Sequence, residues 1–577
     1  MTVVTDADAG PAAEIDRAIS EFQKKKDEWM QLPISKKIAL LEAVRDRLAR
    51  KMVALGRAGA EVKGGADEAS IVGEMLTSVA LPAVYIHKLL HTLRSIQATG
   101  KPPALPCRTT SSGQKAVQVF PLTLYDRCSL LQPGVTVELV LQPGEETVRQ
   151  GEMYDKEGKI TGQQGCICVV LGAGNHGFLA LKDVLVCLFE RGQVVALKPH
   201  PLMAAWQREA DQVLAPLVEA GYVRSLHLPS PQLTRRLLHH PGVGAVHMTG
   251  GTATHDAIVW GPTPEEQRRR RRDNDPLLKV PVTSELGCVT PWLLAPARFT
   301  PAQLAAQARV LVLAATSNAG CNCNSAKVLV LPGDWEQAGE FLQEVRQVLR
   351  TTPQEPPYYP GIRERYEAFK AAYPKSEVIE APARPTSRPM GPPLPFLLNV
   401  LDELPADPKT EYAFNVEPFA PVLTVVRLPT RGAPHFLSAA TRFANECLWG
   451  SLSCSLVLHP QLEREHPMEV QKALDQLRYG VVAVNSWSAM SFTVGPCTWG
   501  AFAGGQSLAE VGSGLGLVSN PYLVEEVQKA LYRAPLQGPA VPQPPHLQPI
   551  PLGVARGLLG FVVGGVAGAV RALWRVG

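Results

Sequence analysis

The sequence predicts an α/β fold built on parallel β-sheets, and three consecutive segments carry this prediction. CICVVLGAGN, which starts at Cys166, is a buried strand followed by a glycine turn; LALKDVLVCLFERG is a helix and QVVALKP is a second buried strand. Strands that are apolar throughout and joined through a helix form βαβ units of parallel sheets. The pattern recurs in HHPGVGAVHMTGG, another strand that ends in a glycine turn, and AAQARVLVLAAT is predicted to be a buried helix.

Helices are predicted at the N-terminus and strands after it. Residues 14–60 contain EIDRAISEFQKKKDEWMQL and SKKIALLEAVRDRLARKMVAL, in which apolar residues recur three and four positions apart, as on one face of a helix. Residues 100–165 are rich in Pro, Gly and β-branched residues. Within them VTVELVLQPGEETVRQG alternates and then turns, which predicts a hairpin or an edge strand.

Composition places the chain among folded, water-soluble proteins. It has 577 residues, of which 45% are hydrophobic and 19% charged, enough for two or three domains with their own cores. The net charge of +4 is small for this length and gives no support to nucleic-acid binding. MTVVTDADAG lacks the basic and then apolar pattern of a leader, and the 11 cysteines are thinly spread. We therefore expect a cytoplasmic protein with free thiols.

The stretch SNAGCNCNSAK contains Cys321 and Cys323, and it is open to four interpretations. A zinc site needs about four Cys or His ligands, so an isolated C-x-C pair predicts no metal. Redox chemistry of the C-x-x-C type needs two residues between the thiols. The remaining interpretations are two buried structural thiols, or one nucleophile among backbone N–H groups and Asn side chains that stabilise an oxyanion.

The same stretch resembles the nucleophile motif of the aldehyde dehydrogenase superfamily, N-x-G-Q-x-C followed by small residues and a basic one. In that motif the nucleophile lies three residues after the glycine, and counting from Gly320 leads to Cys323. Cys321 takes the place of the usual Gln, and we expect it to be a structural neighbour. A disulfide between the two cysteines would be strained.

Three further segments resemble motifs of that family, in the family's order. LGAGNHG resembles the P-W-N turn and implies that the Asn175 amide donates to the oxyanion, although Asn175 alone would be read as a turn residue. TSELGCVTP resembles E-L-G-G-K-x-P and implies that Glu285 is the general base, the alternative being a buried structural Glu. VEPFAPV resembles E-x-F-G-P-V, which implies that Glu417 binds the nicotinamide ribose and Phe419 packs on the nicotinamide.

Two more resemblances concern a dinucleotide cofactor. ALKPHP resembles K-P-[SA]-E and implies that Lys198 holds the adenosine ribose or a 2′-phosphate. Pro201 stands where the family has a ribose-binding Glu, so both NAD and NADP remain open as the cofactor. MTGGTATHD resembles F-T-G-S-x-x-x-G, which implies that Thr249, Gly250 and Gly251 start a helix whose amides face the pyrophosphate.

The resemblance spans roughly residues 25–530 and implies a domain organisation. It implies an α/β, aldehyde dehydrogenase-like fold with a Rossmann-type dinucleotide-binding domain, an α/β catalytic domain and a hairpin that bridges subunits of a homodimer or homotetramer. The expected segments are N-terminal helices and the dinucleotide-binding domain (1–283, with the bridging hairpin at 129–162), the catalytic domain (284–486), a C-terminal return segment (487–533), a Pro-rich linker (534–550) and an apolar Gly-rich tail (551–577).

The run Arg268–Arg272 lies in a polar insertion, PEEQRRRRRDND. The plain interpretation is a solvated loop. The alternatives are docking to anionic lipid or to a polyanionic substrate such as coenzyme A.

The tail contains GLLGFVVGGVAGAV between Arg556 and Arg571. As a helix this segment would be about 21 Å long, short of the roughly 20 residues that a full membrane span needs. Gly560, Gly564 and Gly568 form a tandem G-x-x-x-G pattern, which favours close helix packing. Membrane association, packing onto the enzyme or a partner subunit, and disorder are the three interpretations.

The function that the resemblance implies is NAD- or NADP-dependent oxidation of a small-molecule aldehyde to a carboxylic acid, through a thiohemiacetal and a thioester on Cys323. One alternative is a CoA-acylating dehydrogenase or acyl-CoA reductase, because the Lys198–Pro201 segment resembles CoA-acylating members of the family. Glu285 argues against it, since a water-activating base has no task when CoA accepts the acyl group. A scaffold that keeps the fold without activity is the non-enzymatic alternative.

Overall fold

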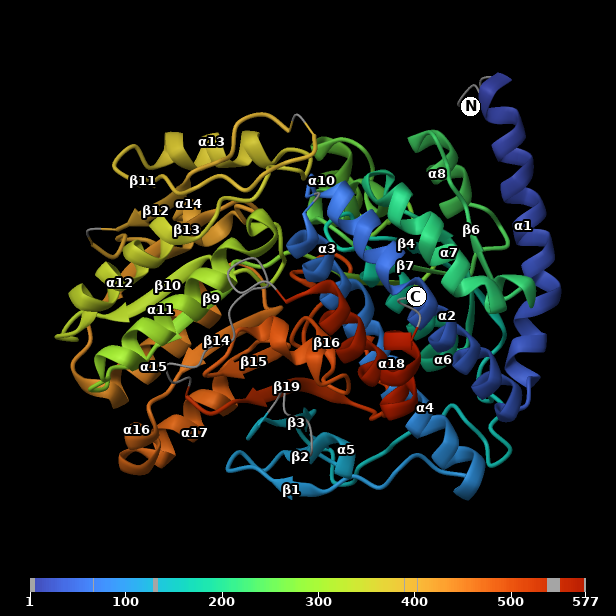
Figure 1. The fold of residues 1–577 in the computed structure, drawn as a ribbon, viewed down its shortest axis with the longest axis horizontal. Coiled ribbons are helices and arrows are strands. Elements are labelled where there is room, and N and C mark those ends of the chain that lie inside the picture. The colour runs from blue at the N-terminus through green and yellow to red at the C-terminus, as the bar shows by residue number, and fades with distance from the viewer. Residues whose placement is uncertain are drawn as a thin grey trace.

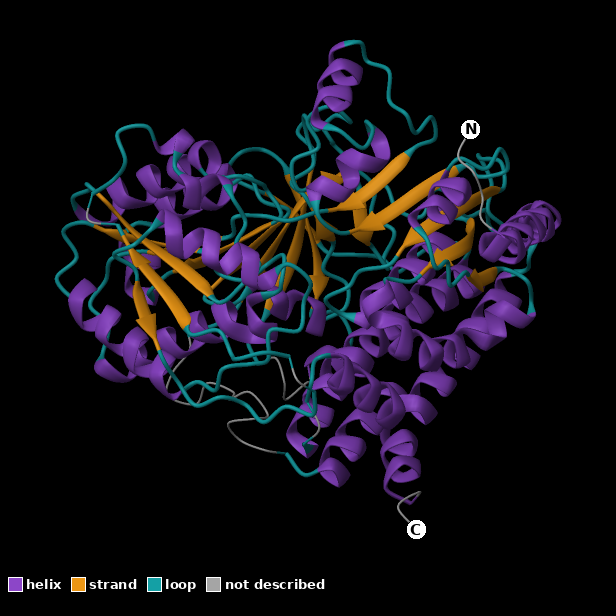
Figure 2. Cartoon of the chain, turned by 90° about the horizontal axis from the view of Figure 1, so that it is seen from above, coloured by secondary structure: helices purple, strands orange, loops and turns teal. Residues whose placement is uncertain are grey.

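Two large β-sheets organise the chain, and helices cover both of them (Figures 1 and 2). The computed structural model describes residues 6–65, 67–127, 133–388, 390–401, 403–536 and 550–574. The predicted class, α/β with parallel sheets, is confirmed.

The smaller sheet has six strands and contains the predicted βαβ unit. β4 pairs in parallel with β5 on one side and with β7 on the other, so the strand order reverses next to β4. In open α/β sheets such a reversal opens a ligand-binding crevice at the carboxyl ends of the strands. In spatial order the strands are β17 (Gly514–Leu515), β8 (Val282–Glu285), β7 (Ala245–Thr249), β4 (Cys166–Leu171), β5 (Gln193–Lys198) and β6 (Val223–Ser225).

The larger sheet has eleven strands, with a parallel centre and antiparallel ends. In spatial order they are β1 (Cys107–Thr109), β2 (Lys115–Phe120), β3 (Thr136–Leu141), β19 (Val527–Arg533), β15 (Val481–Val484), β14 (Ser453–Val457), β9 (Pro291–Leu294), β10 (Val328–Pro332), β13 (Val422–Leu428), β12 (Phe396–Val400) and β11 (Glu377–Ile379). A separate two-stranded sheet consists of β16 (Trp499–Gly500) and β18 (Leu517–Ser519).

The expected hairpin or edge strand in VTVELVLQPGEETVRQG is only partly correct. β3 forms as a strand, but it lies inside the sheet between β2 and β19. Its open edge is covered by a strand from the far end of the chain, which a local pattern cannot reveal. Residues 142–165 form isolated bridges rather than a second strand, and residues 128–132 lie outside the described part of the chain.

The helices predicted at 14–60, 179–192 and 305–316 are all present. The helices that come before β8 in the chain are α1 (Asp6–Gln31), α2 (Ile34–Val62), α3 (Glu68–Met75), η1 (Leu76–Ala80), α4 (Leu81–Thr99), α5 (Leu124–Arg127), α6 (Gly177–Arg191), η2 (Pro201–Met203), α7 (Ala204–Glu219), α8 (Pro231–Leu238), α9 (Thr252–Val259) and α10 (Pro264–Arg272). The others are α11 (Pro301–Thr316), η3 (Ser317–Gly320), α12 (Ala338–Thr351), α13 (Ile362–Ala372), η4 (Pro408–Thr410), α14 (Tyr412–Asn415), α15 (Gly432–Cys447), α16 (Pro460–Glu465), α17 (Pro467–Gln476), η5 (Ser488–Thr493) and α18 (Leu552–Trp574).

The continuous helical segment α3–η1–α4 was not predicted from the sequence pattern. Within the described residues it is the one helix long and apolar enough to cross a membrane, by length and composition alone. Half of its most apolar stretch of 18 residues is buried inside the protein. Leu89 and Leu93 of this segment are fully buried. The segment therefore belongs to the hydrophobic core.

The Arg268–Arg272 run is solvated as expected, since none of its residues is buried, but it forms a helix, α10, and not a loop. Thr263 caps it by accepting a hydrogen bond from the Glu266 N–H at 3.2 Å. A Pro at the first helical position, acidic residues in the first turn and arginines in the last turn all favour a helix here. Arg270 pairs with the Glu266 carboxylate at 2.9 Å, and Arg271 pairs with that of Asp256.

The tail forms α18, which lies against the helices of the N-terminal half (Figure 1). It contacts α2, α3, η1 and α4, and its Ala555, Leu559 and Val563 side chains are buried. Val554 and Leu558 are 53% and 48% exposed, so the opposite face is open. Up to residue 564 the tail thus packs onto the rest of the protein; residues 537–549 of the expected linker lie outside the described part.

Candidate active site

Two side chains from different sheets meet at the centre of the molecule. Glu285 is the last residue of β8, and Cys323 lies in the loop between η3 and β10. The Cys323 thiol and the Glu285 carboxyl group are hydrogen-bond partners. Burial raises the pKa of Glu285 to about 7, against the lowering effect of this hydrogen bond. Burial and the Glu285 charge raise the pKa of the Cys323 thiol well above its usual value.

The loop that carries Cys323, the predicted nucleophile, has an unusual backbone; we call it the nucleophile loop. Asn318 and Ala319 have φ values of 60° and 55°, in the left-handed region, and Gly320 follows at 74°. A non-glycine residue held there costs on the order of 1 kcal/mol or more, which the surroundings must supply. At Gly320 a Cβ atom would lie 2.3 Å from the Ala420 carbonyl oxygen, so only glycine fits.

Lys327 fixes this loop through hydrogen bonds to its backbone. Its ammonium donates to the carbonyl oxygens of Asn322 and Cys323, at 3.0 and 2.8 Å, and forms an ion pair with the Glu417 carboxylate at 2.8 Å. The Lys327 side chain is almost completely buried, and its charge opposes the rise in the pKa of Cys323. The sequence motif contained this lysine only as an unassigned basic residue; the structure connects it to the predicted nucleophile and to the predicted cofactor ligand.

Asn175 lies in the turn between β4 and α6, facing the nucleophile loop. Its amide Nδ2 donates to the Cys321 carbonyl at 3.1 Å, and its Oδ1 accepts from the His176 N–H at 3.1 Å. One N–H of the Asn175 amide is therefore engaged with Cys321, and the second N–H of the same amide stays available for a ligand. Asn175 and Cys323 line the same cavity.

Cys321 points away from that cavity. It is fully buried, and its thiol donates to the Phe419 carbonyl at 3.4 Å. Burial raises the pKa of the Cys321 thiol, and Cys321 and Cys323 are both free thiols. Of the two cysteines, only Cys323 contacts Glu285.

The predicted cofactor residues of the smaller sheet lie at the carboxyl ends of its strands. Lys198 ends β5 and Thr249 ends β7, on the two sides of β4. Burial lowers the pKa of Lys198. The Thr249 hydroxyl donates to the Asp183 carboxylate at 3.1 Å, and the Gly250 N–H donates to the Glu285 carbonyl at 3.0 Å. The crevice is therefore connected directly to the strand that carries Glu285.

The start of α9 fits a bound phosphate. Gly251 is the N-cap residue and has no side chain to satisfy the first N–H groups of the helix. The Thr252 hydroxyl is buried and finds no hydrogen-bond partner among the described residues. Unsatisfied amides and a hydroxyl at a helix N-terminus suit a pyrophosphate group.

Glu417 and Phe419 precede β13, on the larger sheet's side of the site. Glu417 accepts from the Cys288 N–H at 3.3 Å in addition to its ion pair with Lys327. Gly287 makes room for it, since a Cβ there would lie 1.9 Å from the Glu417 carboxylate. Phe419 has a φ of 43° and packs on the Tyr359 ring, with centroids 5.0 Å apart.

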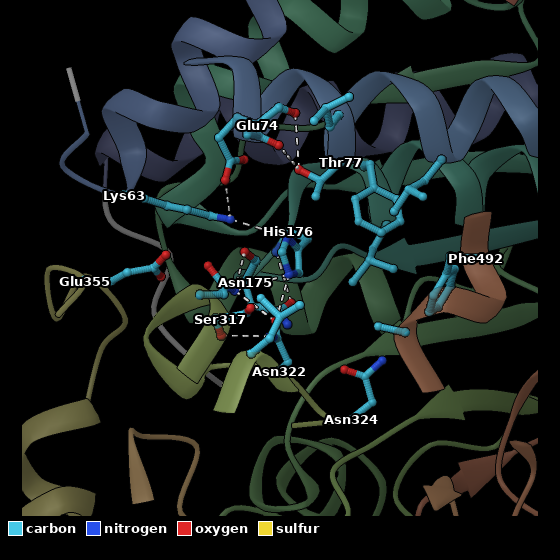
Figure 3. A pocket seen from close by; sticks show the side chains of 18 of the residues that line it. Lys63, Glu74, Thr77, Asn175, His176, Ser317, Asn322, Asn324, Glu355 and Phe492 are labelled. Atoms are coloured by element: carbon cyan, nitrogen blue, oxygen red, sulfur yellow. Dashed lines mark hydrogen bonds and ion pairs between the residues drawn. The ribbon is translucent and has the colours of Figure 1, made fainter. Parts of the chain in front are cut away.

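A cavity of about 450 Å³ leads to Cys323 from the side of α2, α3 and η1. One part of its wall is apolar, and the other is charged and polar (Figure 3). The apolar part includes Leu76, Leu81, Phe178, Leu313, Met490 and Phe492. The polar part includes Lys63, Glu74, His176, Asn322, Glu355 and Arg384.

The sequence motifs gave no role to His176, Lys63 or Glu74. His176 directly follows Asn175 in the turn, yet its partners come from α2 and from the nucleophile loop. Contacts between such distant segments leave no local periodicity or spacing. A lysine on an amphipathic helix would be assigned to the solvated face, and no signal in the sequence would have singled out Lys63.

The sequence matches no known family profile and no curated protein sequence. The structure resembles solved aldehyde dehydrogenases. One, from Mycobacterium tuberculosis and complexed with NAD+, is 18% identical with a TM-score of 0.60, over 92% of this chain and 92% of that chain. Aldehyde dehydrogenase C of Pseudomonas syringae, a mutant complexed with NAD+ and octanal, is 16% identical with a TM-score of 0.59, over 92% and 90%.

A third structure is the NADP-dependent glyceraldehyde-3-phosphate dehydrogenase of Bacillus halodurans C-125, complexed with NADP. It is 15% identical with a TM-score of 0.57, and the match covers 91% of each chain. The chain has the fold of the aldehyde dehydrogenases.

Proposed function

We propose that this protein oxidises an aldehyde to a carboxylic acid, with NAD or NADP as the electron acceptor. The observation that carries the proposal is the contact between the Cys323 thiol and a Glu285 carboxyl group whose pKa is raised to about 7. A thiol nucleophile and a general base that titrates near neutral pH are the two groups that formation and hydrolysis of a thioester require. The fold supports the proposal, because similar structures were solved with NAD+ or NADP.

In the first half of the reaction, Glu285 accepts the thiol proton and the Cys323 sulfur attacks the aldehyde carbon. A C–S bond forms, and the carbonyl oxygen becomes the alkoxide of a thiohemiacetal. We assign two donors to this oxygen, the second N–H of the Asn175 amide and the backbone N–H of Cys323, because both residues line the cavity. The aldehydic hydrogen then leaves with its electron pair, the C=O bond re-forms, and a thioester remains on Cys323.

In the second half, Glu285 first releases its proton to solvent and then activates a water molecule. The water oxygen adds to the thioester carbon while its proton passes to the carboxylate. When the C–S bond breaks, the Cys323 thiolate leaves and the carboxylic acid is free. The raised pKa of Glu285 suits this role, because a base that titrates near the working pH is both available and strong enough.

Bound NAD or NADP would supply the electron-pair acceptor. We assign the start of α9, with Thr249, Gly250 and Gly251, to the pyrophosphate, and Lys198 to the adenosine ribose. Glu417, which Lys327 holds in place, would take the nicotinamide ribose, and Phe419 would pack on the ring. Pro201 offers no carboxylate that would repel a 2′-phosphate, so we expect both cofactors to be accepted.

The test is a panel of aldehydes offered with NAD or NADP, each with and without coenzyme A, followed by the absorbance of the reduced cofactor. We expect turnover without coenzyme A, a carboxylic acid product, and no turnover in Cys323→Ala. An acyl-CoA product formed only with coenzyme A would assign the protein to the CoA-acylating alternative. Failure of both dinucleotides to raise the Tm would contradict the proposal and favour a scaffold.

A further inference from the structure

Four side chains form a chain along the polar wall of the cavity (Figure 3). The Lys63 ammonium lies 2.8 Å from the Glu74 carboxylate and 3.3 Å from Nδ1 of His176. Nε2 of the same imidazole lies 2.8 Å from Oδ1 of Asn322. Asn322 directly precedes the nucleophile, so the chain ends on the peptide that carries the Cys323 N–H.

The donors and acceptors fix the direction of this chain. The Lys63 ammonium can only donate, so Nδ1 of His176 must accept and Nε2 must carry the hydrogen. The Nε2–H then donates to Oδ1 of Asn322, whose Nδ2 donates to the Ser317 carbonyl at 2.9 Å. Burial and the Lys63 charge lower the pKa of His176 well below its usual value, which keeps the imidazole neutral, as this arrangement requires. Nδ2 of Asn318 lies 3.1 Å from the same oxygen and 3.2 Å from Nε2 of His176; because Nε2 carries its own hydrogen, only the oxygen accepts from Asn318.

Asn322 is thus held through its side chain and through its backbone. The side chain is tied to His176 and Ser317, and the backbone carbonyl accepts from Lys327 at 3.0 Å. The peptide between Asn322 and Cys323 cannot rotate without breaking these bonds. Because its N–H is one donor to the proposed oxyanion, even a small rotation would turn that hydrogen away from the developing charge.

We propose that His176 is a positioning residue, which orients the Asn322–Cys323 peptide toward the oxyanion and is itself held by the Lys63–Glu74 ion pair. The inference rests on the proposed function for the identity of the reacting oxygen. His176 acts through Asn322 and does not touch the reacting atoms. The ion pair matters because it fixes the imidazole ring and its tautomer, so that one N–H points at Asn322.

The first test compares His176→Phe with His176→Gln. Phenylalanine fills the space of the ring but neither accepts nor donates, whereas glutamine can accept from Lys63 and donate to Asn322. We expect His176→Phe to lower kcat by about tenfold or more, less than the loss of a whole oxyanion donor, while the KM for the aldehyde stays nearly constant. His176→Gln should recover most of this loss. Equal kcat values for the Phe variant and the wild type would overturn the inference.

The second test needs neither aldehyde oxidation nor cofactor. Acylation of Cys323 by p-nitrophenyl acetate passes through an oxyanion, whereas alkylation by iodoacetamide does not. We expect His176→Phe to slow acylation by about tenfold and to leave alkylation unchanged. Equal slowing of both reactions, together with a lower Tm, would show a merely structural role and would overturn the inference. If the wild type oxidises no aldehyde but this split is found, the proposed function fails and the positioning role stands.

A matched pair of lysine variants tests whether Lys63 holds the His176 side chain in place. Lys51 lies on α2 and Lys63 is the C-cap residue of that helix; both pair with a glutamate, but Lys51 pairs with Glu209 at 3.2 Å and does not line the cavity. We expect Lys63→Met to show the same split between acylation and alkylation as His176→Phe, and Lys51→Met to show none. If the two lysine variants behave alike, Lys63 does not anchor the chain.

Discussion

The carboxyl group of Glu285 and the thiol of Cys323 are hydrogen-bond partners across the junction of two sheets. Glu285 ends a strand of the six-stranded sheet, and Cys323 precedes a strand of the eleven-stranded sheet. Glu285 is buried and Cys323 is partly buried; burial raises the pKa of both groups, and the Glu285 charge raises that of the thiol further. The first two predictions follow from this contact.

Glu285→Gln should separate the two halves of the reaction. The amide keeps the shape of the side chain but cannot accept a proton from water, whereas the thiol can still lose its proton to solvent because removal of the Glu285 charge lowers its pKa. The thioester should therefore accumulate, and kcat should fall by about 10²–10⁴-fold. Because the Glu285 charge raises the pKa of Cys323, its removal should also lower the pH at which iodoacetamide alkylates the thiol. Mass spectrometry of the acylated protein and the pH dependence of alkylation measure the two effects. Unchanged hydrolysis of the thioester would exclude Glu285 as the base.

The rate of thioester hydrolysis should rise with pH through about 7. The pKa of Glu285 is raised to about 7 by burial, and only its ionised form can take a proton from water. Below that pH the carboxyl is protonated and hydrolysis should slow about tenfold for each pH unit; above it the rate should level off. Single-turnover hydrolysis of a preformed acyl-enzyme over this range measures the profile. A rate that is flat across neutral pH in the wild type would contradict the assignment.

Exchange of the two cysteines tests which one is the nucleophile. Cys323→Ala should abolish aldehyde oxidation, because only this thiol contacts Glu285 and lines the cavity. Cys321→Ala removes a buried side chain and its bond to the Phe419 carbonyl, so it should cost about 1 kcal/mol of unfolding free energy and retain activity. Thermal unfolding and steady-state turnover of both variants give the answer. An active Cys323→Ala beside an inactive Cys321→Ala would reverse the assignment.

The βαβ unit and the order of the site motifs could be predicted because each depends on residues close together in sequence. Buried strands have an apolar signature of their own, and counting from Gly320 leads to Cys323, the thiol that contacts Glu285. The charge run at Arg268–Arg272 shows where such reasoning fails. The Thr263 cap and the acidic first turn that make it a helix were both present in the sequence, but the excess of charge dominated our interpretation.

The contacts of Lys327 and His176 could not be predicted because their partners are set by tertiary structure. Lys327 lies between the nucleophile loop and Glu417, which precede two neighbouring strands of the larger sheet. His176 meets Lys63 only because the β4–α6 turn faces the end of α2. A single sequence carries no record of which strands and helices become neighbours. Contacts between distant segments, such as those of Lys327 and His176, therefore appear only in the structure.

Lys327→Met should weaken both the loop and the ribose-binding side of the site. The substitution leaves the Glu417 carboxylate without its cation and releases the carbonyls of Asn322 and Cys323. Breaking a buried ion pair from one side costs about 3–5 kcal/mol, and the partly exposed Glu417 places this variant at the lower end. We expect a lower Tm and a higher KM for the cofactor. Lys51→Met, which breaks a pair at the surface, is the control and should change neither.

The two faces of α18 should respond differently to the same substitution. Leu559 is 1% exposed, against the helices of the N-terminal half, whereas its neighbour Leu558 is 48% exposed. Leu559→Ser loses a buried side chain and buries a hydroxyl, so it should cost about 3 kcal/mol of unfolding free energy; Leu558→Ser should change it by about 0.5 kcal/mol or less. Chemical denaturation of both variants measures the difference. If both substitutions have the same small effect while Leu558→Ser alone reduces sedimentation with membranes, α18 is a membrane helix that does not pack on the enzyme.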